Sequence, residues 1–367
     1  MHTIRSRRLN GSWEMSGESQ EILEATLREV GLLKRRLLRW RAILTYLTIG
    51  LCLTIIAATA IGPVYIPPAE IISIISHKLG LRVGGFSEPH MKIILQLRLP
   101  RILLGVLVGM ALSVAGAIMQ GLFRNPLAGP YVLGVSSGAS LGAALSITFL
   151  PAFMGIYTTP LAAFIGGLTA IFLVYNIVKL CGRFTVKSLL LAGIAVTYLF
   201  SAILSIIVWT LSRDAHTILL WIMGGLWGAD WLKVEVIAPI ILTLILIAFI
   251  FSKDLNALLL GEETARSIGV NVKLVEKLLP ILASLITSAA VSFAGAIGFI
   301  GLMMPHIMRM TVGPDHRILI PSSALAGGIF LVWADAAARC LLELPVGVIT
   351  ALTGVPFFIY LLRRRGP

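Results

Sequence analysis

Uncharged hydrophobic runs alternate with short charged segments along most of this chain. A helix needs about 20 apolar residues to cross the hydrocarbon of a bilayer, and runs near that length recur between the charged residues. They mark predicted spans at residues 42–63, 102–123, two within 125–178, 188–211, 236–252, 278–296, 318–334 and 344–362. The pattern predicts an all-α polytopic membrane protein.

A tenth span is predicted at residues 298–313 because the total number of spans is expected to be even. The hydrophobic pattern of this stretch is weak by itself. This stretch is apolar but short, and it carries Pro305, His306 and Arg309. Nine Lys and Arg residues precede residue 42, and Arg363, Arg364 and Arg365 stand near the other end. Basic residues favour the cytoplasmic side, so both termini are expected there and the number of spans is even. We therefore expect ten transmembrane helices.

The sequence divides into a cytoplasmic amphipathic amino-terminal segment, residues 1–41, and a ten-span domain, residues 42–367. Residues 17–40 place Leu23, Leu27 and Leu37 on one face of a helix, which predicts a helix lying in the membrane interface or a helix that binds a partner. Two further short apolar segments, residues 67–79 and 215–229, are expected to cap the outer side.

An internal repeat is indicated by residues 111–118 (ALSVAGAI) and 290–297 (AVSFAGAI), which share six of eight residues. The first run lies in a span expected to point inward and the second in one expected to point outward. A repeat of inverted topology is common in transporters. Small residues spaced by four, such as Gly105 and Gly109 or Gly138 and Gly142, indicate close helix packing, either within the chain or at a dimer face.

Composition agrees with a membrane protein: 57% of the residues are hydrophobic and only 13% are charged. The net charge of +13 could indicate nucleic-acid binding, but basic residues beside membrane spans more commonly serve to orient the chain in the membrane. We therefore expect no nucleic-acid partner and a location in the cell membrane.

The chemistry that the sequence lacks narrows the function. By this span assignment no ionisable residue lies at mid-membrane depth, which disfavours ion-coupled transport. The chain has no GxxxxGK[ST] motif, so ATP would have to be hydrolysed by another chain. The sequence shows no nucleophile with a base and no metal-ligand cluster. We expect no enzyme activity, no catalytic residue, no metal and no cofactor.

Five motifs together resemble one family, the iron-chelate and cobalamin permeases of binding-protein-dependent ABC importers. They are RLPRILLGVLVG (98–109), FRNPLAGPYVLGVSSGA (123–139), GEETARSIGV (261–270), GFIGLMMPHIMR (298–309) and ELPVGVITALTGVPFF (343–358). The resemblance extends from about residue 42 to the carboxyl end. It implies a homodimer, two cytoplasmic ABC ATPase subunits and an extracytoplasmic substrate-binding protein as partners.

The resemblance also implies site residues. Residues of the loop between spans 6 and 7 would couple to the ATPase: Gly261, Glu262, Glu263, Ala265, Ser267 and Gly269. Asn125, Pro126 and Leu127, together with Val186 and Lys187, would form a cytoplasmic gate, although a plain turn explains the first three equally well.

Three arginines, Arg98, Arg101 and Arg339, would dock the binding protein. Spacing alone equally allows Arg98 and Arg101 to snorkel toward water at a helix end. Only three residues separate Arg339 from the ELPVG motif, which is shorter than the family pattern.

The function predicted from these observations is the membrane-spanning permease of an ABC importer for a large metal chelate. Ferric siderophore, cobalamin, haem and molybdate all remain open as cargo. The alternatives are an ion-coupled or passive carrier that acts alone, and a membrane anchor or sensor that transports nothing.

Overall fold

The computed structural model describes residues 6–9, 12–15, 17–78, 80, 85–150, 154–182, 185–210 and 214–364. The chain divides into two units, Met1–Tyr46 and Leu47–Pro367. Helix α1 (Gly17–Ala60) has residues in both.

The amino-terminal unit differs from the sequence prediction in two ways. Strands β1 (Ser6–Leu9) and β2 (Ser12–Met15) pair antiparallel, with Ser6 opposite Met15. An Asn-Gly pair separates them in the sequence, which is a strong hairpin signal, so the all-helical prediction is wrong for this stretch. Helix α1 then continues to Ala60, and residues 17–40 are its first part instead of a separate helix.

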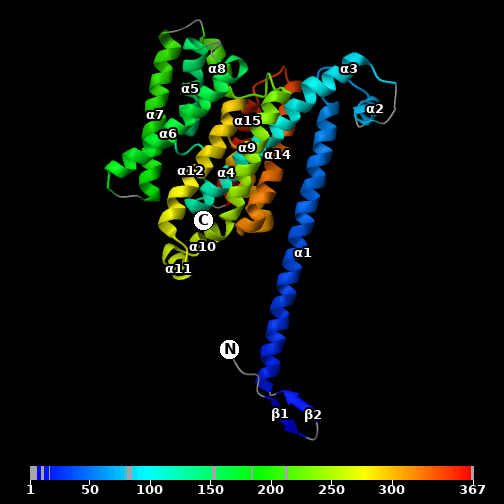
Figure 1. Ribbon diagram of the computed structural model, residues 1–367, viewed down its shortest axis with the longest axis vertical. Coiled ribbons are helices and arrows are strands. Elements are labelled where there is room, and N and C mark those ends of the chain that lie inside the picture. The colour runs from blue at the N-terminus through cyan, green and yellow to red at the C-terminus, as the bar shows by residue number, and fades with distance from the viewer. Residues whose placement is uncertain are drawn as a thin grey trace. The chain divides into compact units, whose positions relative to one another are not determined.

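In the described part of the larger unit every element is helical (Figure 1). After α1 come α2 (Pro68–Lys78), α3 (Glu88–Lys92), the π-helix η1 (Ile93–Arg98), α4 (Leu99–Leu122), α5 (Val135–Phe149), the 3₁₀ turn η2 (Gly155–Tyr157), α6 (Thr158–Leu180) and α7 (Val186–Thr210). There follow α8 (Ala215–Met223), α9 (Trp231–Ile250), α10 (Ser252–Leu259), α11 (Glu262–Ser267), α12 (Val272–Ala294), α13 (Ile300–Val312), α14 (His316–Cys340) and α15 (Val346–Arg364).

Each of the ten predicted spans coincides with a helix. Among the described residues, seven helices are long and apolar enough to cross a membrane, and α5 and α15 are shorter apolar helices. Helix α13, the doubtful span, has 13 residues. The all-α polytopic class is confirmed for this unit, while ten crossings and the side of the termini stay predictions.

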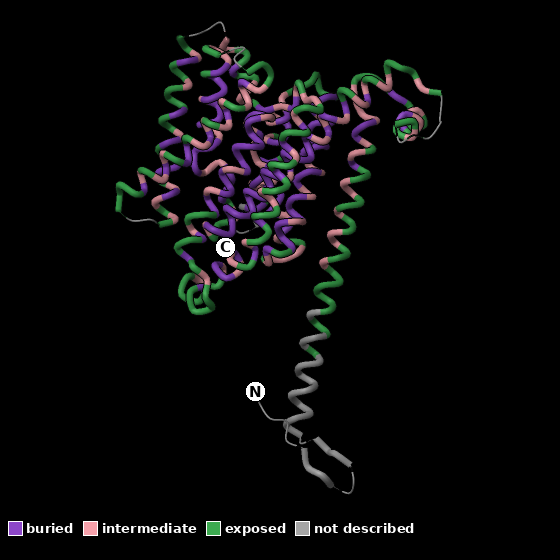
Figure 2. The backbone as a smooth tube through the Cα atoms, in the orientation of Figure 1, coloured by how far each residue is buried: buried purple, intermediate pink, exposed green. Residues whose placement is uncertain are grey.

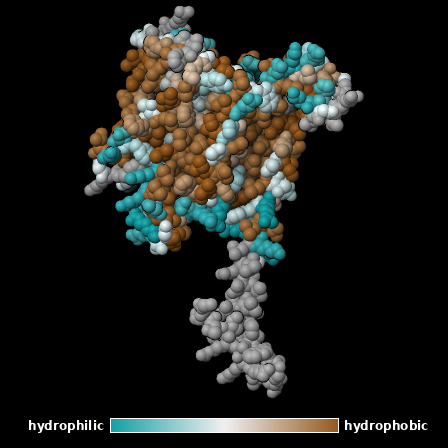
Figure 3. All heavy atoms as spheres, viewed as in Figure 1, coloured by the Kyte–Doolittle hydropathy of each residue, from teal (hydrophilic) through white to brown (hydrophobic). Residues whose placement is uncertain are grey.

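Hydropathy alone does not separate the core helices from those that face lipid. The most apolar stretch within Glu88–Leu122 is 89% buried, whereas that of α9 is only 22% buried, although the two stretches are equally hydrophobic. Figure 2 shows the buried helices at the centre of the larger unit. In the face shown in Figure 3, apolar residues cover the middle of this unit and hydrophilic residues gather toward its ends, which is the surface expected in a bilayer.

The two short segments predicted to cap the outer side form helices α2 and α8. Glu70 of α2 accepts a hydrogen bond from the backbone N–H of Ser87 at 2.7 Å and pairs with Nδ1 of His90 at 2.8 Å. These hydrogen bonds lower the pKa of the Glu70 carboxyl. Helix α2 is thereby tied to the start of α3, but its role as a cap stays a prediction.

Helices α4 and α14 pack antiparallel, and glycines set their distance and register. A Cβ on Gly109 would lie 2.3 Å from the carbonyl oxygen of Gly327, so the two backbones are in contact. Toward one end Arg101 pairs with Asp335, and toward the other Gly121 packs on the ring of His316. Each of these two pairs lies about as many residues from the glycine crossing on α4 as on α14.

A second pair of helices crosses in the same manner. A Cβ on Gly167 of α6 would lie 2.5 Å from Oγ of Ser288 on α12. Gly138 of α5 approaches the carbonyl of Gly166 as closely, at 2.4 Å. Small residues allow such contacts where lipid gives helices no hydrophobic reason to associate. These small residues therefore serve packing inside the chain.

We predict that Gly109→Ala destabilises the protein by about 1–3 kcal/mol, because the added methyl group must push two backbones apart. The measurement is the thermal unfolding midpoint in detergent. Gly298→Ala is the matched control, since a Cβ there meets no atom within 4 Å. Equal midpoints for the two variants would show that the crossing tolerates a side chain.

Candidate functional site

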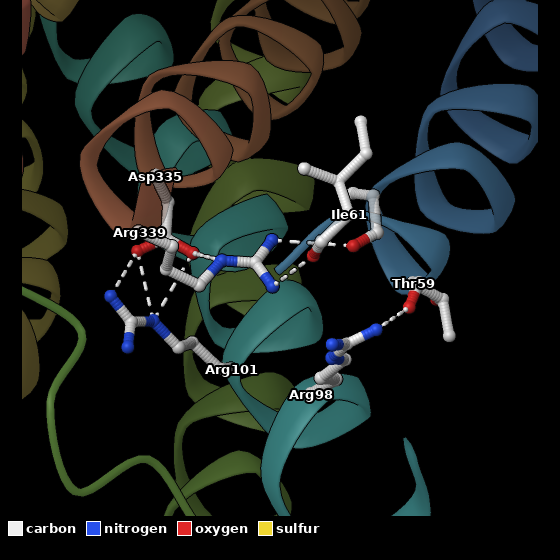
Figure 4. Close-up of polar contacts among 7 residues, drawn as sticks. Thr59, Ile61, Arg98, Arg101, Asp335 and Arg339 are labelled. Carbon is white, nitrogen blue, oxygen red and sulfur yellow. Dashed lines mark hydrogen bonds and ion pairs between the residues drawn. The ribbon is translucent and has the colours of Figure 1, made fainter. Parts of the chain in front are cut away.

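A cluster of charged side chains joins the start of α4 to the end of α14 (Figure 4). Asp335 is only 1% exposed, and its carboxylate lies 2.8 Å from Nη2 of Arg101 and 3.1 Å from Nε of Arg339. Asp335 and Arg339 are four residues apart on α14 and so share one helical face. The buried carboxylate is thus held from two helices at once.

The same cluster holds the end of α1. Arg98 donates to the carbonyl oxygens of Thr59 at 2.8 Å and of Val64, and Arg339 donates to that of Ile61 at 3.0 Å. The last carbonyls of a helix lack partners within it and carry partial negative charge, which suits guanidinium donors. Arg98 is the last residue of η1, and π-helical turns are frequent at functional sites.

The structure places the three predicted docking residues in this one cluster, but it buries two of them. Arg98 and Arg339 are each 5% exposed, whereas Arg101 is more accessible. All three border a cavity of about 380 Å³ that Glu343 also lines. Their role in docking stays a prediction, and Arg101 is the residue best placed for it.

Sequence reasoning missed the part that Asp335 plays. By the predicted spans it is only one of the ionisable residues that lie away from mid-membrane depth. The four-residue spacing to Arg339 was the available signal. No signal in the sequence indicates the ion pair with Arg101, which is 234 residues away.

We predict that Asp335→Asn destabilises the protein by about 3–5 kcal/mol, because it leaves buried guanidinium groups without a counter-charge. The unfolding midpoint in detergent measures this loss. Glu343→Gln, which removes an exposed carboxylate beside the same cavity, should have little effect. If both variants unfold alike, the buried pairing contributes nothing to stability.

The six residues predicted to couple to an ATPase lie on or beside the short helix α11. Gly261 precedes the helix with φ of +113° and Gly269 follows it with φ of +91°, conformations that favour glycine. The amide of Gly269 bonds to the carbonyl of Arg266, and that of Val270 to the carbonyl of Ala265, which closes the helix.

The side chains of α11 divide between the protein interior and solvent. Ala265 is fully buried, while Glu262, Glu263 and Ser267 are exposed, and Glu262 pairs with Arg266 at 3.4 Å. A Cβ on Gly269 would meet nothing within 4 Å of this chain, so its positive φ explains the glycine here. The apolar side chains of Leu260 and Ile268 flank the helix and are 68% and 61% exposed. Apolar side chains beside exposed charges are typical of a protein-binding surface.

Asn256 on α10 links this surface to the core. Its Nδ2 donates to Asp315 at 2.7 Å, and its Oδ1 accepts from the backbone N–H of His316 at 2.8 Å. Since the ring of His316 packs on Gly121, the link reaches both α14 and α4. A displacement of α10 and α11 would therefore act directly on the two central helices.

The predicted gate residues lie in two places. Asn125, Pro126 and Leu127 form a turn after α4, in which Oδ1 of Asn125 accepts the amide of Leu127 at 2.9 Å. Val186 and Lys187 are the first residues of α7. The Asn125 bond is what a plain turn requires, and the gate role stays a prediction.

An apolar cavity of about 570 Å³, lined mainly by α15, the end of α8 and Ala296, was not predicted from the sequence. Gly347 permits α15 to approach α8, since a Cβ there would lie 2.1 Å from the carbonyl of Met223. Lining residues such as Leu352 and Val355 carry no chemical signal in the sequence. Within the described residues, no group of three His, Cys, Asp or Glu side chains could hold a metal ion.

An all-helical unit with helices of membrane length, an apolar cavity and a short exposed helix between α10 and α12 is typical of a polytopic membrane protein. The chain belongs to the FecCD transport family, which matches residues 50–364. It is a permease subunit and not an enzyme, and in these transporters separate subunits hydrolyse ATP. The family resemblance, the absence of enzyme activity and the membrane location predicted from the sequence are confirmed.

Several relatives with assigned names are similar to most of the chain. A cobalamin import system permease protein of Halobacterium salinarum is 48% identical over 77% of this chain and 76% of its own length. A hemin transport system permease protein of Yersinia pestis is 42% identical over 74% of this chain and 83% of its own. The solved structure of an inward-facing metal-chelate type ABC transporter matches with a TM-score of 0.77 and 30% identity, covering 88% of this chain and 99% of the other.

Proposed function

We propose that this protein is the permease of an ABC importer that carries a large metal chelate, of the class of cobalamin, haem or ferric chelates. The relatives named for cobalamin and hemin support this substrate class. The observation that carries the proposal is the surface of α11, where exposed Leu260 and Ile268 flank exposed charges. An ATPase subunit that docks there would drive transport through α10 and Asn256.

The proposed topology has ten spans with both termini in the cytoplasm. An inverted repeat is supported by the two matching crossings, Gly109 with Gly327 and Gly167 with Ser288, in which the third helix of each half packs on the first helix of the other. The helix lengths support it too, since α4, α5 and α6 have 24, 15 and 23 residues and α12, α13 and α14 have 23, 13 and 25.

The proposed transporter is a homodimer with two ATPase subunits and an extracytoplasmic binding protein. The cavity beside α15 is lined by apolar residues, and exposed apolar residues of α15, including Leu352 and Ile359, continue its surface. A second copy related by twofold symmetry would close this cavity into a path. Asn125 to Leu127, with Val186 and Lys187, would narrow the path on the cytoplasmic side.

Coupling is tested by Leu260→Glu with Ile268→Glu. Replacing two exposed apolar contacts by charges should lower ATPase co-purification at least tenfold without changing the unfolding midpoint of the permease. Leu150→Glu is the control, since Leu150 is 48% exposed and lies after α5, before the start of α6. The proposed coupling surface is wrong if the double variant keeps the ATPase as well as the control does.

Docking of the binding protein is tested by Arg101→Gln. We expect up to about fivefold weaker binding and a smaller salt dependence, because accessible ion pairs contribute about 0–1 kcal/mol. The unfolding midpoint should fall as well, because Asp335 loses one of its two partners. Arg98→Gln is the comparison: it should mainly lower the unfolding midpoint, since Arg98 is buried and holds α1. Unchanged affinity and salt dependence in Arg101→Gln would contradict docking at this cluster.

A further inference from the structure

A cluster of five cations lies on α1 directly before its uncharged part. It consists of Lys34, Arg35, Arg36, Arg39 and Arg41, and no Asp or Glu occurs between Glu29 and Glu70. The family model matches from residue 50, after this cluster. Cations on this side of a span orient the chain, but the transport function gives these five side chains no binding role.

The cations occupy more than half of the helix surface. Because successive residues of an α-helix turn by about 100°, these five side chains are spread over about 220° of its circumference, and Leu37 and Trp40 lie in the remaining arc. All five are exposed. The guanidinium of Arg36 lies 4.7 Å from the ring of Trp40, an aromatic residue type enriched at membrane interfaces.

The position of the cluster along α1 matches the headgroup layer of a bilayer. Residues 42–60, the uncharged part of the helix, rise about 28 Å, close to the roughly 30 Å of hydrocarbon in a membrane. When these residues span the hydrocarbon, Arg41 and Trp40 stand at the boundary and the remaining cations lie within and just beyond the headgroups. Long basic side chains reach phosphates readily from such positions.

We propose that residues 34–41 form a binding site for anionic phospholipids, in which the cations contact headgroup phosphates over more than half of the circumference of α1. Charge complementarity and depth favour lipid over a protein partner, because cations spread over about 220° of a helix can reach headgroups on several sides, whereas a docked protein contacts one face. Each cation near an anionic surface contributes to such binding, which salt weakens. The site does not depend on which substrate the permease carries.

The test is a titration of the delipidated full-length protein in detergent with phosphatidylglycerol or phosphatidylcholine of the same acyl chains, followed by native mass spectrometry. The wild type should bind phosphatidylglycerol more tightly, and high salt should remove the difference. Arg35→Gln, Arg36→Gln and Arg39→Gln together should weaken phosphatidylglycerol binding about a hundredfold and leave phosphatidylcholine binding unchanged.

Two further variants make the result specific. Lys253→Gln, Lys273→Gln and Lys277→Gln remove the same charge from exposed positions elsewhere and should keep the wild-type affinity. Replacing Arg35, Arg36 and Arg39 by Lys keeps the charge and should keep binding. Equal weakening in both glutamine variants, or none in the first, would overturn the proposal. So would unchanged lipid binding with loss of a co-purifying ATPase or RNA, which would assign the cluster to that partner.

Discussion

The antiparallel contact between α4 and α14 is the constraint on which the rest of this structure depends. Both helices are apolar, and lipid offers them no hydrophobic reason to associate, so the contact needs backbones that touch. Gly109 and Gly327 provide it. Once these two residues are opposite each other, Arg101 is level with Asp335 and Gly121 is level with His316. A single packing contact therefore positions both the charge cluster at one end and the polar link at the other.

The charge cluster shows how a buried carboxylate can join helices inside a membrane protein. A carboxylate that is 1% exposed is unfavourable unless it is paired, and Asp335 is paired from two helices. The guanidinium groups of Arg98 and Arg339 also donate hydrogen bonds to backbone carbonyls at the end of α1 and directly after it. Helix α1, which has little other burial, is held to the core by these donors.

The end of α14 that begins at His316 joins the core to the exposed surface of α11 by a different kind of contact. There Asn256 connects α10 to α14 through short hydrogen bonds, and α11 follows α10 after two residues. In the proposed importer these hydrogen bonds would connect the ATPase-binding surface to α14 and, through His316, to α4, the helices that also carry the charge cluster.

The sequence by itself determined the membrane class, the places of the ten helices and the family, because spans, turns and motifs are local patterns of 10 to 20 residues. The family resemblance indicated α11 for the same reason, since the motif GEETARSIGV is a single run of residues 261–270. Tertiary structure decided which apolar helices are core and which face lipid, because α4 and α9 are equally hydrophobic and differ only in their neighbours. It also decided that Arg98 and Arg339 are buried and that Arg101 meets Asp335. Spacing along one helix shows that Arg98 and Arg101 share a face, but a partner 234 residues away is set by the register of two packed helices.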